Sequence, residues 1–182
     1  MLDEESKIPN FLQKIINNPE NYEISVYQRA AIVRGNRGPI KVHSLYIIKD
    51  KENDTDYTLS FNGTVDFLPL SKGAWAINTP TDRAGYEKML SGKNGYDMKL
   101  IVPNEVIDIK TTLNNIINSI NSETKYYFMD HRSNMKNREN CNTALFNTLA
   151  ISLPDYKLPR NVPQKPYFSF LLNTAPAFYQ GR

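Results

Sequence analysis

Two stretches of the chain carry apolar residues at the spacing of an amphipathic helix. The first covers residues 9–18, where Pro9 suits a first-turn position and Pro19 follows as a stop signal. The second runs from Asn104, as its cap, to about Asn121. Its apolar stripe is the clearest in the chain and consists of Val106, Ile109, Leu113, Ile116, Ile117 and Ile120. Both stretches therefore predict helices with one buried face.

Two shorter segments also predict helices from their end signals. Residues 82–90 start near Asp82 and end before Gly92, a residue that favours helix termination. Residues 140–149 follow a polar loop, and Asn140 is a good helix cap. We therefore expect Cys141 to occupy the first position of that helix.

Between these helices, β-branched and aromatic residues occur in short extended runs that are bounded by turn residues. The predicted strands are residues 22–34 (one or two strands), 40–49, 57–61, 96–102 and 125–129, and residues 65–77 are irregular or hold a short strand around Trp75. Together with the helices, these runs predict an α+β fold with a central antiparallel sheet.

A length of 182 residues predicts a single domain, 1–182. Within it we distinguish an N-terminal helical segment, 1–21, and an α+β core, 22–153. The last part, 154–182, contains five prolines, at positions 154, 159, 163, 166 and 176. It is expected to be a Pro-rich extension that docks on the core.

Composition and charge narrow the class of protein. Hydrophobic residues make up 40% of the chain, which argues against general disorder. The net charge is only +3, and Lys and Arg are scattered, whereas a nucleic-acid-binding protein usually concentrates them in a stripe. Nucleic acid is therefore not an expected partner.

Targeting signals are sparse. The chain starts Met-Leu-Asp-Glu-Glu, which is acidic where a secretory signal peptide is basic. No stretch approaches the ~20 apolar residues of a transmembrane helix. A single cysteine cannot form an internal disulfide, which favours a reducing compartment. We expect a soluble protein that is cytoplasmic, or secreted without a cleaved signal peptide.

The best chemical lead is Cys141 at its predicted helix start. Free backbone amides and the positive end of the helix dipole favour a thiolate there, and the same amides can stabilise an oxyanion. A lone cysteine is also commonly a small buried hydrophobic residue, so a structural role is the alternative.

A nucleophilic cysteine needs a base, and the chain has two histidines. His43 lies near the beginning of a predicted strand, which would hold its imidazole rigidly. His131 lies in a charged loop, where a solvated histidine is unremarkable. His43 is therefore the preferred base, and His131 is a supporting candidate.

A third group should orient the imidazole. The strand that follows His43 presents Ser60 and Asn62 on one face. We predict Asn62 as the orienting residue, with Ser60 as the second choice and Asn140 as a supporting residue beside the cysteine.

The residues His43-Ser44, Ser60-Phe61-Asn62-Gly63 and Asn140-Cys141-Asn142-Thr143-Ala144 resemble motifs of the circularly permuted papain-like cysteine hydrolases. That group includes NlpC-type peptidases, PPPDE peptidases and lecithin–retinol acyltransferases. The resemblance covers residues 41–149 and includes the order of the histidine before the cysteine. The chain departs from that group in two ways: the strand after His43 has no acidic partner for the histidine, and the Pro-rich extension has no counterpart in the group.

The resemblance implies a papain-like, circularly permuted sheet packed against the helix that carries the cysteine. It also implies a thiol-dependent hydrolase or acyltransferase that cleaves an amide, isopeptide or acyl bond. The expected substrates are peptides, ubiquitin-like conjugates, peptidoglycan or acyl groups, with no cofactor and no metal, and an effector or toxin role is compatible with it. The alternative is a non-enzymatic protein-interaction domain with a structural cysteine.

Overall fold

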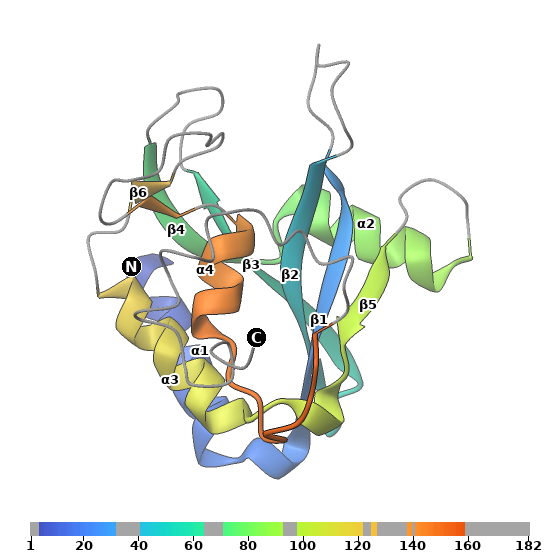
Figure 1. The fold of residues 1–182 in the computed structure, drawn as a ribbon, viewed down its shortest axis with the longest axis vertical. Coiled ribbons are helices and arrows are strands. Elements are labelled where there is room, and N and C mark those ends of the chain that lie inside the picture. The colour runs from blue at the N-terminus through green and yellow to red at the C-terminus, as the bar shows by residue number, and fades with distance from the viewer. Residues whose placement is uncertain are drawn as a thin grey trace.

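A central antiparallel sheet with helices on both faces organises the chain (Figure 1). The computed structural model describes residues 4–31, 41–63, 71–92, 98–121, 125–126, 138–139 and 141–158 of the 182-residue chain. Their helices are α1 (Glu4–Asn17), α2 (Pro80–Leu90), α3 (Ile109–Ile120) and α4 (Cys141–Thr148), with short 3-10 helices η1 (Pro19–Asn21) and η2 (Asn104–Val106). Their strands are β1 (Tyr22–Ala31), β2 (Lys41–Asp50), β3 (Thr55–Gly63), β4 (Ser71–Ile77), β5 (Lys99–Val102), β6 (Lys125–Tyr126) and β7 (Arg138–Glu139). The predicted α+β class with an antiparallel sheet is confirmed.

The five longer strands are arranged in the order β5-β1-β2-β3-β4, and each neighbouring pair is antiparallel. Strands β1 to β4 follow one another along the sheet, and β5 returns to pair with β1. The two-residue strands extend the β4 edge, with β6 antiparallel to β4 and β7 parallel to β6. The sheet thus places β2, which carries His43, near its centre.

Strands β2 and β3 separate at one end. Their pairing begins at Tyr46 opposite Leu59 and continues to Asp50 opposite Thr55. The remaining residues of β3 pair only with β4, and the remaining residues of β2 pair only with β1. Helix α4 contacts both strands, and Figure 1 shows its upper end between β2 and the β3–β4 pair. The separation gives the start of α4 access to the sheet.

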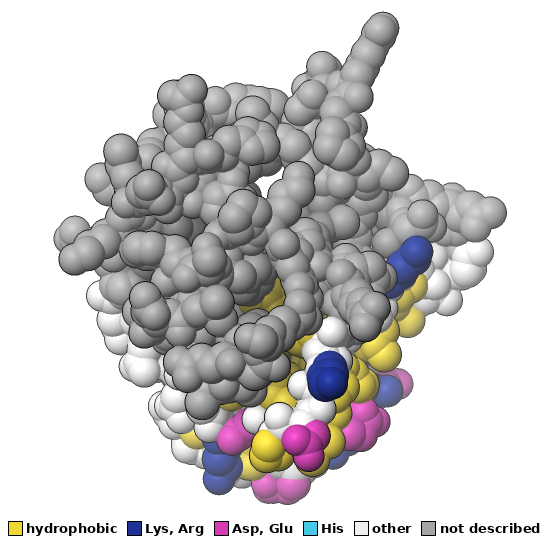
Figure 2. Space-filling view, in the orientation of Figure 1, with side chains coloured by type: hydrophobic (Ala, Val, Ile, Leu, Met, Phe, Trp, Pro, Cys, Tyr) yellow, Lys and Arg dark blue, Asp and Glu magenta, His cyan; other side chains and the backbone are white. Residues whose placement is uncertain are grey.

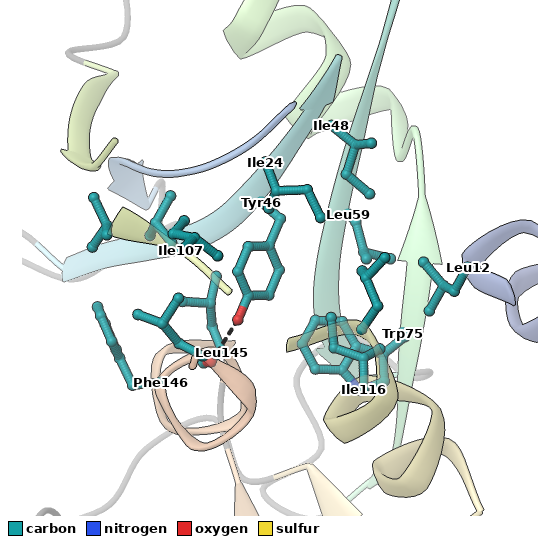
Figure 3. Close-up of a cluster of buried hydrophobic side chains, with 14 of the residues drawn as sticks. Leu12, Ile24, Tyr46, Ile48, Leu59, Trp75, Ile107, Ile116, Leu145 and Phe146 are labelled. Atoms are coloured by element: carbon teal, nitrogen blue, oxygen red, sulfur yellow. Dashed lines mark hydrogen bonds between the residues drawn. The ribbon is translucent and has the colours of Figure 1, made fainter. Parts of the chain in front are cut away.

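Two apolar clusters lie on opposite faces of the sheet because side chains alternate along each strand. On β2, Tyr46 and Ile48 join the larger cluster, which α1, α3 and α4 cover (Figure 3). Leu45 and Ile47 join the smaller cluster with Tyr86 of α2 and Met98. Helix α2 therefore lies on the face opposite α4.

Two predicted helix starts are wrong. Helix α1 begins at Glu4, so Pro9 lies inside the helix and not in its first turn. The helix tolerates the lost backbone donor because Leu12 and Ile15 are fully buried in the core. Helix α3 begins at Ile109, with Asp108 as its cap.

Asn104 has a different role from the predicted cap. It starts the 3-10 helix η2, and its side-chain oxygen accepts a hydrogen bond of 2.8 Å from the backbone N–H of Ile24. The Asn104 side chain, which the sequence pattern predicts as a local helix cap, thus forms a long-range hydrogen bond to β1.

The segment after α4 returns to the core. Tyr156 and Leu158 pack against the larger cluster, while residues 159–182 of the predicted Pro-rich extension lie outside the described residues. Among the helices that the structure describes, none has the length and apolar character needed to cross a membrane.

Candidate functional site

Cys141 is the first residue of α4, forms no disulfide and has 7% of its surface exposed. The next residue, Asn142, anchors this turn to the sheet, since its Oδ1 accepts a hydrogen bond of 2.6 Å from Ser44 Oγ. Ser44 in turn accepts a hydrogen bond of 3.0 Å from Gln28 Nε2. A chain of side-chain bonds from β1 and β2 therefore fixes the position of the cysteine.

The last turn of α4 is anchored by Tyr46. Its hydroxyl donates to the carbonyl oxygen of Leu145 at 3.0 Å and lies 3.1 Å from Thr148 Oγ1. Figure 3 shows the ring pointing from the sheet to the helix, and the ring also stacks on Trp75 with centroids 6.2 Å apart. Both ends of the helix are thus bonded to β2.

His43 is buried on β2, with 6% of its surface exposed. Alternation along the strand places it on the α2 face, while its neighbour Ser44 faces α4. Its imidazole is nevertheless a hydrogen-bond partner of Cys141. The contact is compatible with the separation of β2 from β3, which lets the first turn of α4 approach the histidine.

Asp82 of α2 lies on the other side of the imidazole. Its Oδ1 is 3.2 Å from His43 Nε2, and the carboxylate is 1% exposed. The contact has ion-pair distance without hydrogen-bond alignment, since Nε2 has no partner that meets hydrogen-bond geometry. The three groups form a sequence of thiol, imidazole and carboxylate.

Four further contacts hold the Asp82 carboxylate. Oδ1 accepts hydrogen bonds from Arg29 Nε at 3.0 Å and Arg29 Nη2 at 2.8 Å. Oδ2 accepts from Ser60 Oγ at 2.6 Å and Thr79 Oγ1 at 2.9 Å. The carboxylate is therefore fixed by donors from β1, β3 and the cap of α2.

These contacts shift two pKa values in opposite directions. Burial opposes the imidazolium, but the charge of Cys141 and the contacts to Cys141 and Asp82 outweigh burial and raise the pKa of His43 to about 9. Burial also opposes the Asp82 carboxylate, yet His43, Ser60 and Arg29 hold its pKa well below its usual range. At neutral pH the site therefore favours an imidazolium beside an ionised carboxylate.

The predicted site residues divide into three groups. Cys141 and His43 are brought together. Ser60 bonds to Asp82, and Asn62 Nδ2 donates to Ser60 Oγ at 2.7 Å, so within the described residues Asn62 reaches the imidazole through Ser60 and Asp82. His131 and Asn140 lie outside the described residues.

Asp82 is the residue that the sequence interpretation missed for the position facing the imidazole. Its sequence signal is local, because Thr79 and Asp82 form a helix-capping pair in which Asp82 N–H donates to Thr79 Oγ1. The capping role alone accounts for an aspartate at this helix start, so the sequence gives no sign that Asp82 has a second role. Only the packing of α2 against β1 and β3 shows that the carboxylate also reaches His43.

The described surface carries charges of both signs. Figure 2 shows one face of the molecule, where acidic and basic side chains lie near each other among apolar ones along the lower part. Among the residues that the structure describes, no group of three or more His, Cys, Asp or Glu side chains is placed to hold a metal ion.

Comparisons of the chain with known protein families, with curated proteins and with solved structures find no match. What the site can do is therefore inferred from its own geometry and residue chemistry.

Proposed function

We propose that this protein is a thiol-dependent hydrolase or acyltransferase in which Cys141 is the nucleophile, His43 the general base and acid, and Asp82 the orienting carboxylate. One observation carries the proposal. A buried imidazole lies between the thiol at a helix start and an ionised carboxylate that several donors hold in place. This sequence of groups activates nucleophiles in acyl transfer.

In the proposed reaction His43 already holds the thiol proton before substrate binds, so the resting site is a thiolate–imidazolium pair. The thiolate of Cys141 attacks the carbonyl carbon of an amide, isopeptide or ester, and a tetrahedral intermediate forms. His43 then donates its proton to the leaving amine or alcohol as the carbon–heteroatom bond breaks, which leaves a thioester on Cys141. Water, deprotonated by His43, hydrolyses the thioester, or a second acceptor takes the acyl group.

The start of α4 supplies the second catalytic element. The first N–H groups of a helix have no partner within the helix, and they carry the positive end of its dipole. In the proposed reaction these amides donate to the oxyanion of the tetrahedral intermediate beside Cys141. Ser44 and Asn142 hold this turn in place through their bond of 2.6 Å.

The proposal extends to the fold and the substrate class. We infer a circularly permuted papain-like domain, supported by the histidine that precedes the cysteine and by a cysteine helix packed on an antiparallel sheet. The carboxylate from α2, and not from the strand after His43, distinguishes this chain within that inference. Peptides, ubiquitin-like conjugates, peptidoglycan stems and acyl groups are the substrates to screen.

The test uses an activated ester because it requires no knowledge of the natural substrate. Hydrolysis of p-nitrophenyl acetate is measured for the wild type, Cys141→Ala, His43→Ala and the double variant. We expect each single change to remove most of the rate enhancement and the double change to remove little more, because residues that act as one unit are not additive.

His131→Ala is the control, as it changes the second histidine of the chain, and it should retain the wild-type rate. Thermal unfolding checks each variant, and Cys141→Ala should lose about 1 kcal/mol. Hydrolysis that persists in Cys141→Ala contradicts nucleophilic catalysis. A wild type without activity, combined with an unfolded Cys141→Ala, favours the structural cysteine.

A further inference from the structure

A buried arginine shares the Asp82 carboxylate with the imidazole. Arg29 is 7% exposed, and its backbone is paired directly opposite His43 in the β1–β2 register. Two of its N–H groups donate to Asp82 Oδ1, at 3.0 Å and 2.8 Å. The same oxygen lies 3.2 Å from His43 Nε2. One carboxylate oxygen therefore faces two cationic groups.

The geometry of the three contacts differs. The two bonds from Arg29 meet hydrogen-bond criteria, while the Nε2 contact does not. An oxygen that already accepts two hydrogen bonds has little remaining capacity for a third. Arg29 thus has the stronger directional contact with Asp82, and His43 has the weaker one.

A glycine in the middle of α2 makes room for this arginine. A Cβ at Gly85 would lie 3.3 Å from Arg29 Cδ and 3.3 Å from Met98 Cε, which is closer than ordinary packing. Glycine inside a helix is less favourable than alanine, since its backbone loses more conformational freedom. Its presence here is explained by the passage of the Arg29 side chain beneath the helix to Asp82.

The charged groups that face the imidazole come from three elements. Among the described residues they are Cys141 on α4, Asp82 on α2 and, through Asp82, Arg29 on β1. When Cys141 is a thiolate and His43 an imidazolium, the two cations, His43 and Arg29, balance the two anions, Cys141 and Asp82. Without Arg29, the imidazolium would be the sole cationic partner of Asp82 within the described part of the chain.

We propose that Arg29 is a positioning residue that shares Asp82 with His43, holds the carboxylate in place and limits how tightly that carboxylate retains the imidazolium proton. A general acid must release its proton to the leaving group, and a carboxylate without a second partner would hold it too firmly. This inference rests on the proposed acyl-transfer function of Cys141, His43 and Asp82.

The test measures the His43 titration directly. In a His131→Ala background His43 is the single histidine of the chain, so its ring signals in an NMR titration are unambiguous. Removing the nearby positive charge favours the imidazolium, and Arg29→Gln should raise the pKa of His43 by about 1. Arg29→Lys keeps the charge and should return the pKa most of the way to the wild-type value.

Arg83→Gln is the matched control. Arg83 lies on the same helix as Asp82 but pairs with Glu87 near the surface, so the pKa of His43 should not change. A folded Arg29→Gln variant in which this pKa is unchanged or lower overturns the inference.

Where Arg29→Gln shows no cooperative thermal unfolding, Gly85→Ala replaces it. That variant displaces the arginine while keeping every charge, and it should raise the pKa by less. An unchanged value there also overturns the inference.

The NMR readout requires no turnover, which separates the two proposals. If Arg29→Gln raises the pKa of His43 while the wild type hydrolyses no ester, the effect of Arg29 on the imidazolium stands and the hydrolase proposal fails. If the wild type hydrolyses the ester and the pKa does not respond, Arg29 has no such role.

Discussion

The imidazole of His43 lies between a thiol that belongs to a helix on one face of the sheet and a carboxylate that belongs to a helix on the other. Both contacts are shielded from water, since Cys141 and Asp82 are buried as well. Charge interactions are stronger in such a medium than in solvent. The properties of this one ring are therefore set by two neighbours that come from distant parts of the sequence.

At the residue scale, Asp82 and Asn62 should differ in their importance for activity. Asp82→Asn removes the charge beside the imidazole, and we expect a loss of about a hundredfold or more in the hydrolysis of p-nitrophenyl acetate. Asn62→Ala removes only a donor to Ser60 and should cost about tenfold or less. Equal losses in kcat/KM for the two variants would contradict the assignment of Asp82.

The pH dependence of activity gives a second residue-scale prediction. His43 must be protonated to act as the general acid, so activity should fall as the pH rises through about 9. Asp82→Asn removes a contact that raises this pKa, and its alkaline limb should move to lower pH. The hydrolysis rate of an unactivated alkyl ester from pH 6 to 11 measures both, because its alcohol leaving group, unlike p-nitrophenolate, needs the proton of His43. An alkaline limb that moves upward in Asp82→Asn would refute the assigned contact.

The sequence predicts part of this site because part of its signal is local. A cysteine after a polar cap and a histidine in a strand are visible as Cys141 and His43. The third member is not, because Asp82 is separated from His43 by 39 positions (82 − 43) and already has a local role as a capping partner of Thr79. Alternation along β3 correctly groups Ser60 with Asn62, but it contains no information on where α2 lies.

At the scale of elements, strands were predicted more accurately than helix starts. A half-buried strand repeats its signal at every second residue, as Tyr46 and Ile48 show against Leu45 and Ile47. A helix start depends on one or two residues, whose side chains can be used elsewhere. Asn104 is such a case, because it bonds to Ile24 in β1.

The close approach of β3 and β4 predicts a sensitive glycine. A Cβ at Gly73 would lie 2.7 Å from Phe61 Cε1, and Phe61 itself packs edge-on against Trp75. Gly73→Ala should therefore destabilise the protein by about 2 kcal/mol, because the ring must move within a packed core. Denaturant unfolding measures this loss.

A double-mutant cycle identifies the cause of that loss. In a Phe61→Leu background the added methyl group has more room, so the cost of Gly73→Ala should fall by about half or more. Gly92→Ala is the comparison. It has φ of +65° and no neighbour within 4 Å, so its cost of about 1 kcal/mol should not depend on residue 61. Full additivity at Gly73 would exclude the steric explanation.

At the scale of the whole molecule, folding places several charged groups in a nearly dry interior. Arg29, Asp82 and His43 are all at most 7% exposed. Buried ion pairs require mutual compensation, and removing one partner leaves an uncompensated charge. The same groups that prepare the site for chemistry therefore also link the stability of the fold to pH.

The low pKa of Asp82 predicts the direction of that linkage on the acid side. Its pKa is depressed in the folded state, so the unfolded chain takes up the proton first as the pH falls. The stabilisation is present above the ordinary aspartate pKa of about 4 and is lost progressively below it. Thermal unfolding at pH 6 and pH 3 should show a decline on the order of 1 kcal/mol from this group.

Asp82→Asn separates this effect from general acid denaturation. The variant should be less stable than the wild type at pH 6, because Arg29 then lacks its anionic partner. It should also lose less stability between pH 6 and pH 3. An identical decline in both proteins would show that other carboxyl groups cause the acid sensitivity.

The meeting of α4 with the gap between β2 and β3 also has a kinetic consequence. Cys141 and His43 are 98 positions apart (141 − 43), so their contact closes one of the longer loops in the chain. Such contacts are entropically costly and form slowly during folding. Enhanced reactivity of the thiol toward iodoacetamide at low pH should consequently appear late in refolding, after the local helices and the β2–β3 hairpin. The time at which the thiol becomes reactive would then report when α4, on one face of the sheet, reaches His43.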